Sequence, residues 1–115
     1  MSSTKIISVL GATGSIGVNA LNVVRSYPDL YRIKYLSAHS QADLLIEQAL
    51  EFSPSAVSIG DPEQYDKVKQ ALPHVEVLQG RSGLLELADR DDVDTMLNAL
   101  VGSAGMEPTI KSIQA

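Results

Sequence analysis

A glycine-rich turn between a short apolar run and an amphipathic segment restricts the fold of this chain more than any other feature. The apolar run Ile6 to Leu10 predicts a strand at Lys5 to Leu10, and Gly-Ala-Thr-Gly-Ser-Ile-Gly follows it at Gly11 to Gly17. Apolar residues at helical spacing then continue to Ser26. A strand, a GxxGxxG turn and a helix in this order are typical of the first βαβ unit of a dinucleotide-binding sheet.

Each residue type in this turn suits the binding of a phosphate. The absence of Cβ at Gly11 allows a tight turn, its absence at Gly14 lets backbone approach a pyrophosphate, and its absence at Gly17 lets the helix pack close to the strand. Backbone N–H groups at the helix start face the anion, and Thr13 and Ser15 add uncharged hydroxyl donors. A P-loop is disfavoured because no Gly-Lys-Ser/Thr follows. The alternative is an ordinary loop that packs a helix.

Strands and helices are predicted to alternate along the rest of the chain. Further strands are expected at Arg32 to Ala38, Ser55 to Ile59, Val75 to Leu78 and Thr95 to Val101. Helices are expected at Ser15 to Ser26, at Ala42 to Phe52, from an N-cap at Asp61 to Pro73, at Ser82 to Arg90, and from near Glu107 onward. This alternation indicates an α/β fold, a Rossmann-like doubly wound parallel sheet of about five strands.

Right-handed crossovers most simply place these strands in the order 3-2-1-4-5. Ligands of such sheets bind beyond the carboxyl ends of the strands, at the switch point beside the first strand. The glycine turn lies at that point.

Composition narrows the class of protein. The 115 residues suffice for one domain, spanning residues 1–115. The absence of Cys excludes disulfides, thiolate metal sites and a Cys nucleophile, and it fits a cytoplasmic location. The apolar run before Gly11 is too short for a signal peptide, and no stretch is long enough for a membrane span. The net charge of −5 and the scattered basic residues argue against nucleic acid as a partner.

The loop after the second predicted strand bears on the choice between NAD and NADP. In NAD enzymes an acidic residue about 20 residues after the glycine turn holds the ribose 2′-hydroxyl. Here the stretch Ala38, His39, Ser40 and Gln41 contains no carboxylate, so a 2′-phosphate meets no repulsion and finds hydrogen-bonding side chains. This favours NADP, although no Arg or Lys stands in the loop. The alternative is a solvated loop that caps the next helix.

Four motifs in order resemble the 1-deoxy-D-xylulose 5-phosphate reductoisomerase family, and the likeness spans nearly the whole chain. They are the turn at Gly11 to Gly17, Leu-Ser-Ala at Leu36 to Ala38, Ile-Glu-Gln-Ala-Leu-Glu-Phe-Ser-Pro at Ile46 to Pro54, and Asn-Ala-Leu-Val-Gly-Ser-Ala-Gly-Met-Glu-Pro-Thr at Asn98 to Thr109. The resemblance implies that NADPH is the cofactor. It places the phosphates and nicotinamide near Thr13 to Ile16, the 2′-phosphate near His39 to Gln41, and the small residues Ala99 to Gly105 near the cofactor. The alternative for Ala99 to Gly105 is a crowded strand-to-helix turn.

The cofactor-binding residues expected on these grounds come from three segments. They are Gly11, Thr13, Gly14, Ser15, Ile16, Gly17, Ala38, His39, Ser40, Gln41, Ala99 and Gly102. The family usually carries Gly, a basic or small polar residue, and Asn in the loop where this chain has His39, Ser40 and Gln41.

The resemblance also implies what the whole enzyme does. It rearranges 1-deoxy-D-xylulose 5-phosphate and reduces the product with hydride from NADPH, giving 2-C-methyl-D-erythritol 4-phosphate for isoprenoid biosynthesis. A divalent metal, Mg or Mn, holds the sugar-phosphate substrate, and the enzyme is a homodimer. Family members continue well beyond Ala115, where the catalytic and metal-binding residues lie. We therefore expect no catalytic or metal-binding residue in this chain, and no activity from it alone.

Other arrangements of reactive residues receive less support. His39 and His74 lack further ligands at metal spacing, and the run Asp89 to Asp94 lacks the Gly of a calcium loop, so it is expected to be a solvated turn. Ser15 has no nucleophile elbow around it. The alternative function is a non-catalytic Rossmann module that senses a nucleotide or binds a protein. Another NADP enzyme, such as a semialdehyde dehydrogenase, is disfavoured by the motif at Asn98 to Thr109.

Overall fold

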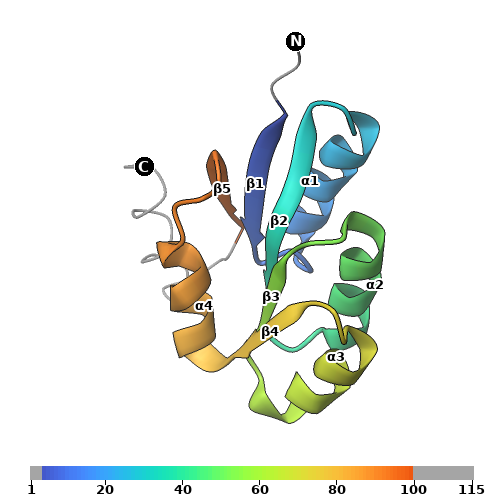
Figure 1. Ribbon diagram of the computed structural model, residues 1–115. Coiled ribbons are helices and arrows are strands. Elements are labelled where there is room, and N and C mark those ends of the chain that lie inside the picture. The colour runs from blue at the N-terminus through green and yellow to red at the C-terminus, as the bar shows by residue number, and fades with distance from the viewer. Residues whose placement is uncertain (1–3, 100–115) are drawn as a thin grey trace.

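The computed structural model describes residues 4–99, which form a five-stranded parallel sheet with helices on both faces (Figure 1). The elements are β1 (Lys5–Leu10), α1 (Ser15–Ser26), β2 (Tyr31–Ala38), α2 (Ala42–Phe52), β3 (Ala56–Ile59), a 3₁₀ helix (Pro62–Gln64), α3 (Tyr65–Ala71), β4 (Glu76–Gln79), α4 (Gly80–Asp89) and β5 (Thr95–Asn98). The predicted fold class is confirmed, and β1, α1 and α2 have the predicted bounds. The predicted end of the last strand and the predicted last helix lie outside the described residues.

Most of the remaining boundaries shift by one or two residues, and the segment before α3 has an identifiable local structure. Asp61 caps it as predicted, since its carboxylate accepts a hydrogen bond of 3.0 Å from the Glu63 N–H, and Pro62 takes the first helical position. The first turn is 3₁₀, and the α-helical part begins only at Tyr65.

The strand order is β4-β3-β2-β1-β5, so the predicted order 3-2-1-4-5 was wrong. The prediction placed the fourth strand beside the first, whereas β4 extends the sheet beyond β3 and β5 pairs with β1. The reason lies in α3. Its Val68 and the following Leu72 join the same core as the buried residues of α1 and α2, so α3 covers the same face. Right-handed crossovers on one face keep advancing the sheet in one direction.

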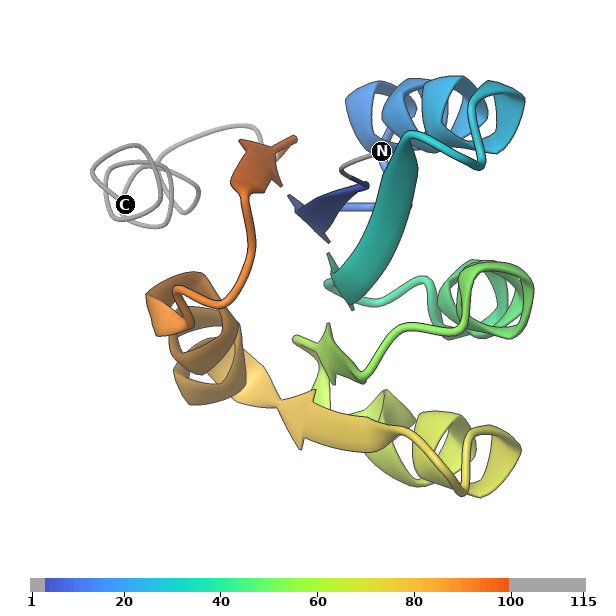
Figure 2. The same ribbon diagram turned by 45° about the horizontal axis from the view of Figure 1, so that its top comes forward.

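The chain reverses only after β4, when α4 crosses the opposite face of the sheet (Figure 2). Leu87 and Ala88 of α4 pack with Leu10, Tyr35 and Ala56, which point to that face from β1, β2 and β3. This return brings β5 to the free edge of β1. The switch point therefore lies beside β1 as predicted, although β5 and not β4 forms its second side.

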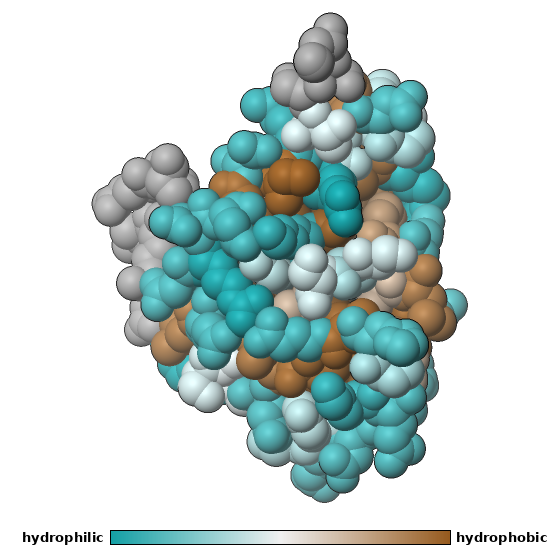
Figure 3. Space-filling model, viewed as in Figure 1, coloured by the Kyte–Doolittle hydropathy of each residue, from teal (hydrophilic) through white to brown (hydrophobic). Residues whose placement is uncertain are grey.

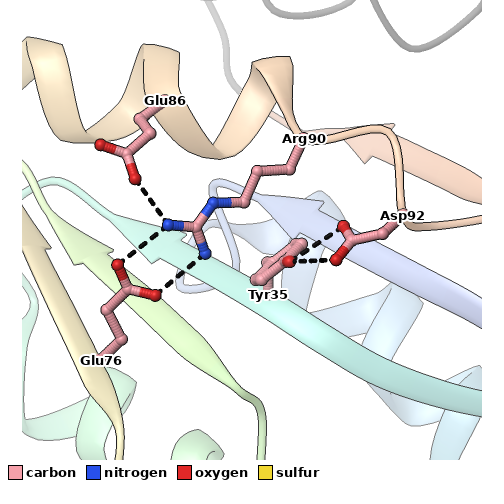
Figure 4. A network of polar contacts seen from close by, with 5 residues as sticks. All are labelled: Tyr35, Glu76, Glu86, Arg90 and Asp92. Atoms are coloured by element: carbon pink, nitrogen blue, oxygen red, sulfur yellow. Dashed lines mark hydrogen bonds and ion pairs between the residues drawn. The ribbon is translucent and has the colours of Figure 1, made fainter.

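A polar network fixes the connection from α4 to β5 (Figure 4). The Tyr35 hydroxyl donates to the Asp92 carboxylate at 2.8 and 2.9 Å, and the Arg90 guanidinium lies 5.2 Å from the Tyr35 ring centroid. Arg90 also forms a bidentate pair with Glu76 of β4 at 3.1 and 2.9 Å and a further pair with Glu86. Burial raises the pKa of Tyr35 above its ordinary value, at which a phenol is already a donor at neutral pH.

The acidic run at Asp89 to Asp94 is part of this connection, and its surface is hydrophilic in Figure 3. Lys34 donates to Asp92 at 2.8 Å, and the Asp94 carboxylate accepts from the Ile6 N–H at 2.7 Å. Within residues 4–99 no group of three or more His, Cys, Asp or Glu side chains is arranged to hold a metal ion. No helix in that range is long and apolar enough to cross a membrane.

Candidate functional site

A cleft of about 530 Å³ opens at the carboxyl edge of the sheet. The cleft is lined by the β1–α1 turn and by the ends of β2 and β3 with the residues just after them. The start of α4, which follows β4, and Ala99, which follows β5, complete the lining. The predicted site residues that line it are Gly11, Thr13, Gly14, Ala38, His39 and Ala99. The cleft therefore lies where the sheet topology predicts a ligand.

The glycine turn is held in place by the end of β2. The Gly11 N–H donates to the Ser37 carbonyl at 3.1 Å and to the Ser37 hydroxyl at 3.0 Å, and the Ala12 N–H donates to the same carbonyl at 2.7 Å. Gly11 has φ 79°, a left-handed conformation that disfavours side chains. These contacts account for the Ser of the Leu-Ser-Ala motif, because Ser37 accepts from the turn with both its backbone carbonyl and its side-chain hydroxyl.

Gly14 and Gly17 face different surroundings. A Cβ on Gly17 would lie 2.2 Å from the Gly11 carbonyl oxygen and 2.7 Å from the Ala12 Cα, so the predicted close packing of α1 is confirmed. A Cβ on Gly14 would meet only the Gly11 carbonyl oxygen, at 3.7 Å. The space beside Gly14 is therefore open to the cleft, as the approach of a pyrophosphate requires.

Several predicted site residues do not line the cleft. Ser15 and Ile16 are exposed on the first turn of α1, and Ser40 and Gln41 are exposed just before α2. Gly17 is buried in the packing of α1, and Gly102 lies outside the described residues. Within the loop after β2, it is His39 that turns toward the cleft. Its Nδ1 lies 2.6 Å from the position of a Cβ on Gly60, at the end of β3.

The β3 and β4 side of the cleft was not predicted from the sequence. Its residues are Ser58, Gly60, Gly80, Arg81 and Leu84. These residues were not predicted because the expected strand order placed the fourth strand beside β1, whereas β4 pairs with β3. The available signal was Gly80, which follows β4 and opens α4 in a second strand–glycine–helix junction.

The charge around the cleft favours an anion. Among the described lining residues Arg81 carries a permanent positive charge, and none is Asp or Glu. Both α1 and α4 begin at the cleft, with no acidic residue in the first turn and no side-chain hydrogen bond at the N-cap. Their first N–H groups and the positive ends of their dipoles are therefore not offset by a capping carboxylate.

Comparison with known proteins agrees with this geometry. The family model described as 1-deoxy-D-xylulose 5-phosphate reductoisomerase matches residues 7–115. The reductoisomerase of Phocaeicola vulgatus is 43% identical over 113 residues, which are 96% of this chain and 30% of that protein. That of Thermodesulfovibrio yellowstonii is 38% identical over 110 residues, covering 96% of this chain and 29% of the relative. The chain thus spans about 30% of the length of these relatives.

Solved structures agree in fold. The 1-deoxy-D-xylulose 5-phosphate reductoisomerase from Zymomonas mobilis in complex with NADPH matches with a TM-score of 0.90 and 32% identity, over 97% of this chain and 30% of that one. A DOX-P reductoisomerase in complex with NADPH, fosmidomycin and magnesium matches with a TM-score of 0.87 and 36% identity, over 94% of this chain and 27% of that one.

Proposed function

Because the chain belongs to the 1-deoxy-D-xylulose 5-phosphate reductoisomerase family, we propose that residues 1–115 are the NADPH-binding domain of such an enzyme. The observation that supports this most directly is the cleft itself. It lies at the switch point of the sheet, is open beside Gly14, and carries no carboxylate among its described lining residues. The solved structure from Zymomonas mobilis, which matches this fold, is a complex with NADPH.

The residues of the cleft fit the parts of a dinucleotide. Gly14, the first N–H groups of α1 and the Thr13 hydroxyl would hold the pyrophosphate, the N–H groups and the hydroxyl as donors. The adenosine half would lie over the ends of β2 and β3, near His39, and the exposed Ser40 and Gln41 follow His39 in the same loop. The nicotinamide half would lie toward β5, where Ala99 lines the cleft. Bound NADPH supplies the hydride for a reduction.

The activity of the whole enzyme is part of the proposal. It isomerises 1-deoxy-D-xylulose 5-phosphate and reduces the product to 2-C-methyl-D-erythritol 4-phosphate in isoprenoid biosynthesis, as the family membership supports. Substrate, a divalent metal such as Mg²⁺ or Mn²⁺, and the catalytic residues belong to the part of the enzyme that this chain does not cover. We further propose a cytoplasmic homodimer, on the strength of the family resemblance.

Isothermal titration of the chain with NADPH, and separately with NADH, tests the cofactor assignment. We expect binding of NADPH with tighter affinity than NADH, because the end of β2 offers no carboxylate to repel a 2′-phosphate. Equal affinities would keep the dinucleotide site and remove the claim of NADP selectivity. Absence of binding of both, from a chain that circular dichroism shows to be folded, would contradict the proposed function of the domain.

A further inference from the structure

The proposed NADPH site needs a positive charge for the 2′-phosphate, which carries roughly −2 at neutral pH. The loop after β2 has no Arg or Lys at His39, Ser40 or Gln41. Hydrogen bonds from these side chains leave most of that charge uncompensated. The structure brings a cation to the cleft from elsewhere, because Arg81 at the start of α4 lines it.

The strand order places Arg81 on the adenosine side of the cleft. β4 pairs with β3 and β3 pairs with β2, so the start of α4 follows the ends of β2 and β3 along the same edge. His39 extends from the end of β2 onto Gly60 at the end of β3. Backbone hydrogen bonds from Gly60 to Ala38, at 2.8 Å, and from Asp61 to His39, at 2.7 Å, join these two ends. Arg81 and His39 therefore approach the end of β3 from opposite sides.

A buried hydroxyl in the same wall is an independent sign of a ligand. Ser58 of β3 lines the cleft and is 1% exposed, and its Oγ has no hydrogen-bond partner among the described residues. It lies under the first turn of α4, where a Cβ on Gly83 would come within 3.2 Å of it. Because a buried hydroxyl without a partner is costly, a polar ligand atom in the cleft is the natural partner for it.

We propose that Arg81 is the residue that selects NADPH over NADH, by pairing with the 2′-phosphate, while Ser58 donates to the adenosine half of the cofactor. This inference rests on the proposed NADPH site. In this chain the specificity-determining cation then stands on α4, across the end of β3, and not in the loop after β2. The guanidinium suits the task because its planar set of donors matches two phosphate oxygens at once.

The test compares Arg81→Gln with Arg32→Gln by titration with NADPH and NADH, and with 2′,5′-ADP and 5′-AMP as adenosine-half probes. Arg32 is an exposed control with the same change of charge, at the amino end of β2 and about 20 Å from the cleft along the strand. In Arg81→Gln we expect the affinity for NADPH and 2′,5′-ADP to fall roughly 10- to 100-fold, as for loss of a charged hydrogen bond. The affinity for NADH and 5′-AMP should stay within about twofold, and Arg32→Gln should leave all four unchanged.

A second variant tests the placement of the charge. Ser40→Lys, added to Arg81→Gln, puts a cation in the loop after β2 and should restore the preference for NADPH. An equal loss of NADPH and NADH affinity in Arg81→Gln would assign Arg81 to the shared pyrophosphate and overturn this inference, and so would unchanged selectivity. Failure of the unsubstituted chain to bind either cofactor would instead overturn the proposed function. The two failures are therefore distinguishable.

Discussion

The side-chain amide of Gln48 donates a hydrogen bond of 2.8 Å to the backbone carbonyl of Ala12, inside the glycine turn. Gln48 comes from α2, and both residues are buried. A carbonyl at this place has no strand partner, because the turn has already left β1. The bond therefore satisfies a buried acceptor and ties the second helix to the turn that shapes the cleft. It also gives a physical reason for Gln48 in the motif Ile46 to Pro54.

Replacing Gln48 by Met should lower the free energy of unfolding by about 1 kcal/mol. The Ala12 carbonyl loses its donor, which costs about 1 to 3 kcal/mol, and removal of the buried Gln48 Oε1, which has no hydrogen-bond partner among the described residues, offsets part of that cost. Urea denaturation followed by circular dichroism measures this. The neighbouring Glu47 is exposed on the same helix, so Glu47→Met is the matched control and should change stability by less than about 0.5 kcal/mol. Equal effects of the two substitutions would show that the buried bond has no special role.

Gly17→Ala should destabilise the fold, although Ala is normally the better helix residue by about 1 kcal/mol. The added Cβ would lie 2.2 Å from the Gly11 carbonyl oxygen, so α1 has to move away from the turn. Overpacking of this kind costs about 1 to 3 kcal/mol. Gly14→Ala is the control, since its Cβ would meet backbone only at 3.7 Å. Gly14 is the N-cap of α1, where Ala is less favourable than Gly, so Gly14→Ala should cost some stability as well. Thermal melting should show the larger loss for Gly17→Ala, and the reverse order would contradict the packing described for α1.

The ion pair between Arg90 and Glu76 predicts that protonation of Glu76 accounts for part of the loss of folding stability at acidic pH. The Arg90 hydrogen bonds lower the pKa of Glu76 in the folded chain. A carboxylate with a lowered folded pKa stabilises the fold above its unfolded pKa, about 4.3, and this stabilisation is lost as the pH falls through the folded pKa. Glu76 is half exposed, so solvent screening limits the effect to less than about 1 kcal/mol.

The substitution Glu76→Gln tests this dependence, because it removes the titrating group and keeps the shape of the side chain. Denaturant unfolding at several pH values between 7 and 3 should show a smaller loss of stability on acidification than in the unsubstituted chain. Glu63 is an exposed carboxylate outside the Arg90 network, so Glu63→Gln serves as the control and should keep the full loss. If the stability of Glu76→Gln fell with pH as steeply as that of the unsubstituted chain, a contribution from the pair with Arg90 would be excluded.

The parts of the fold that depend on nearby residues followed from the sequence, and the parts that depend on distant packing did not. The spacing of the glycines predicted the tight junction of β1 and α1, because strand, turn and helix are contiguous. The face covered by α3 depends on where Val68 and Leu72 find apolar partners, and that choice set the strand order. Arg81 was missed for the same reason, since its place in the cleft follows from the pairing of β4 with β3. Gln48 reaches the turn only through tertiary packing.

Gly14→Val should abolish NADPH binding and leave the sheet folded. Gly14 has φ −77° and ψ 171°, a conformation that a β-branched residue adopts without strain, and its Cβ would meet no backbone closer than 3.7 Å. The Cβ and its methyl groups would instead project into the space proposed for the pyrophosphate. Circular dichroism should therefore match the unsubstituted chain, while titration with NADPH gives no measurable binding. A folded Gly14→Val chain that retains NADPH affinity would remove the pyrophosphate from this turn, because no bound phosphate can share that space with the valine side chain.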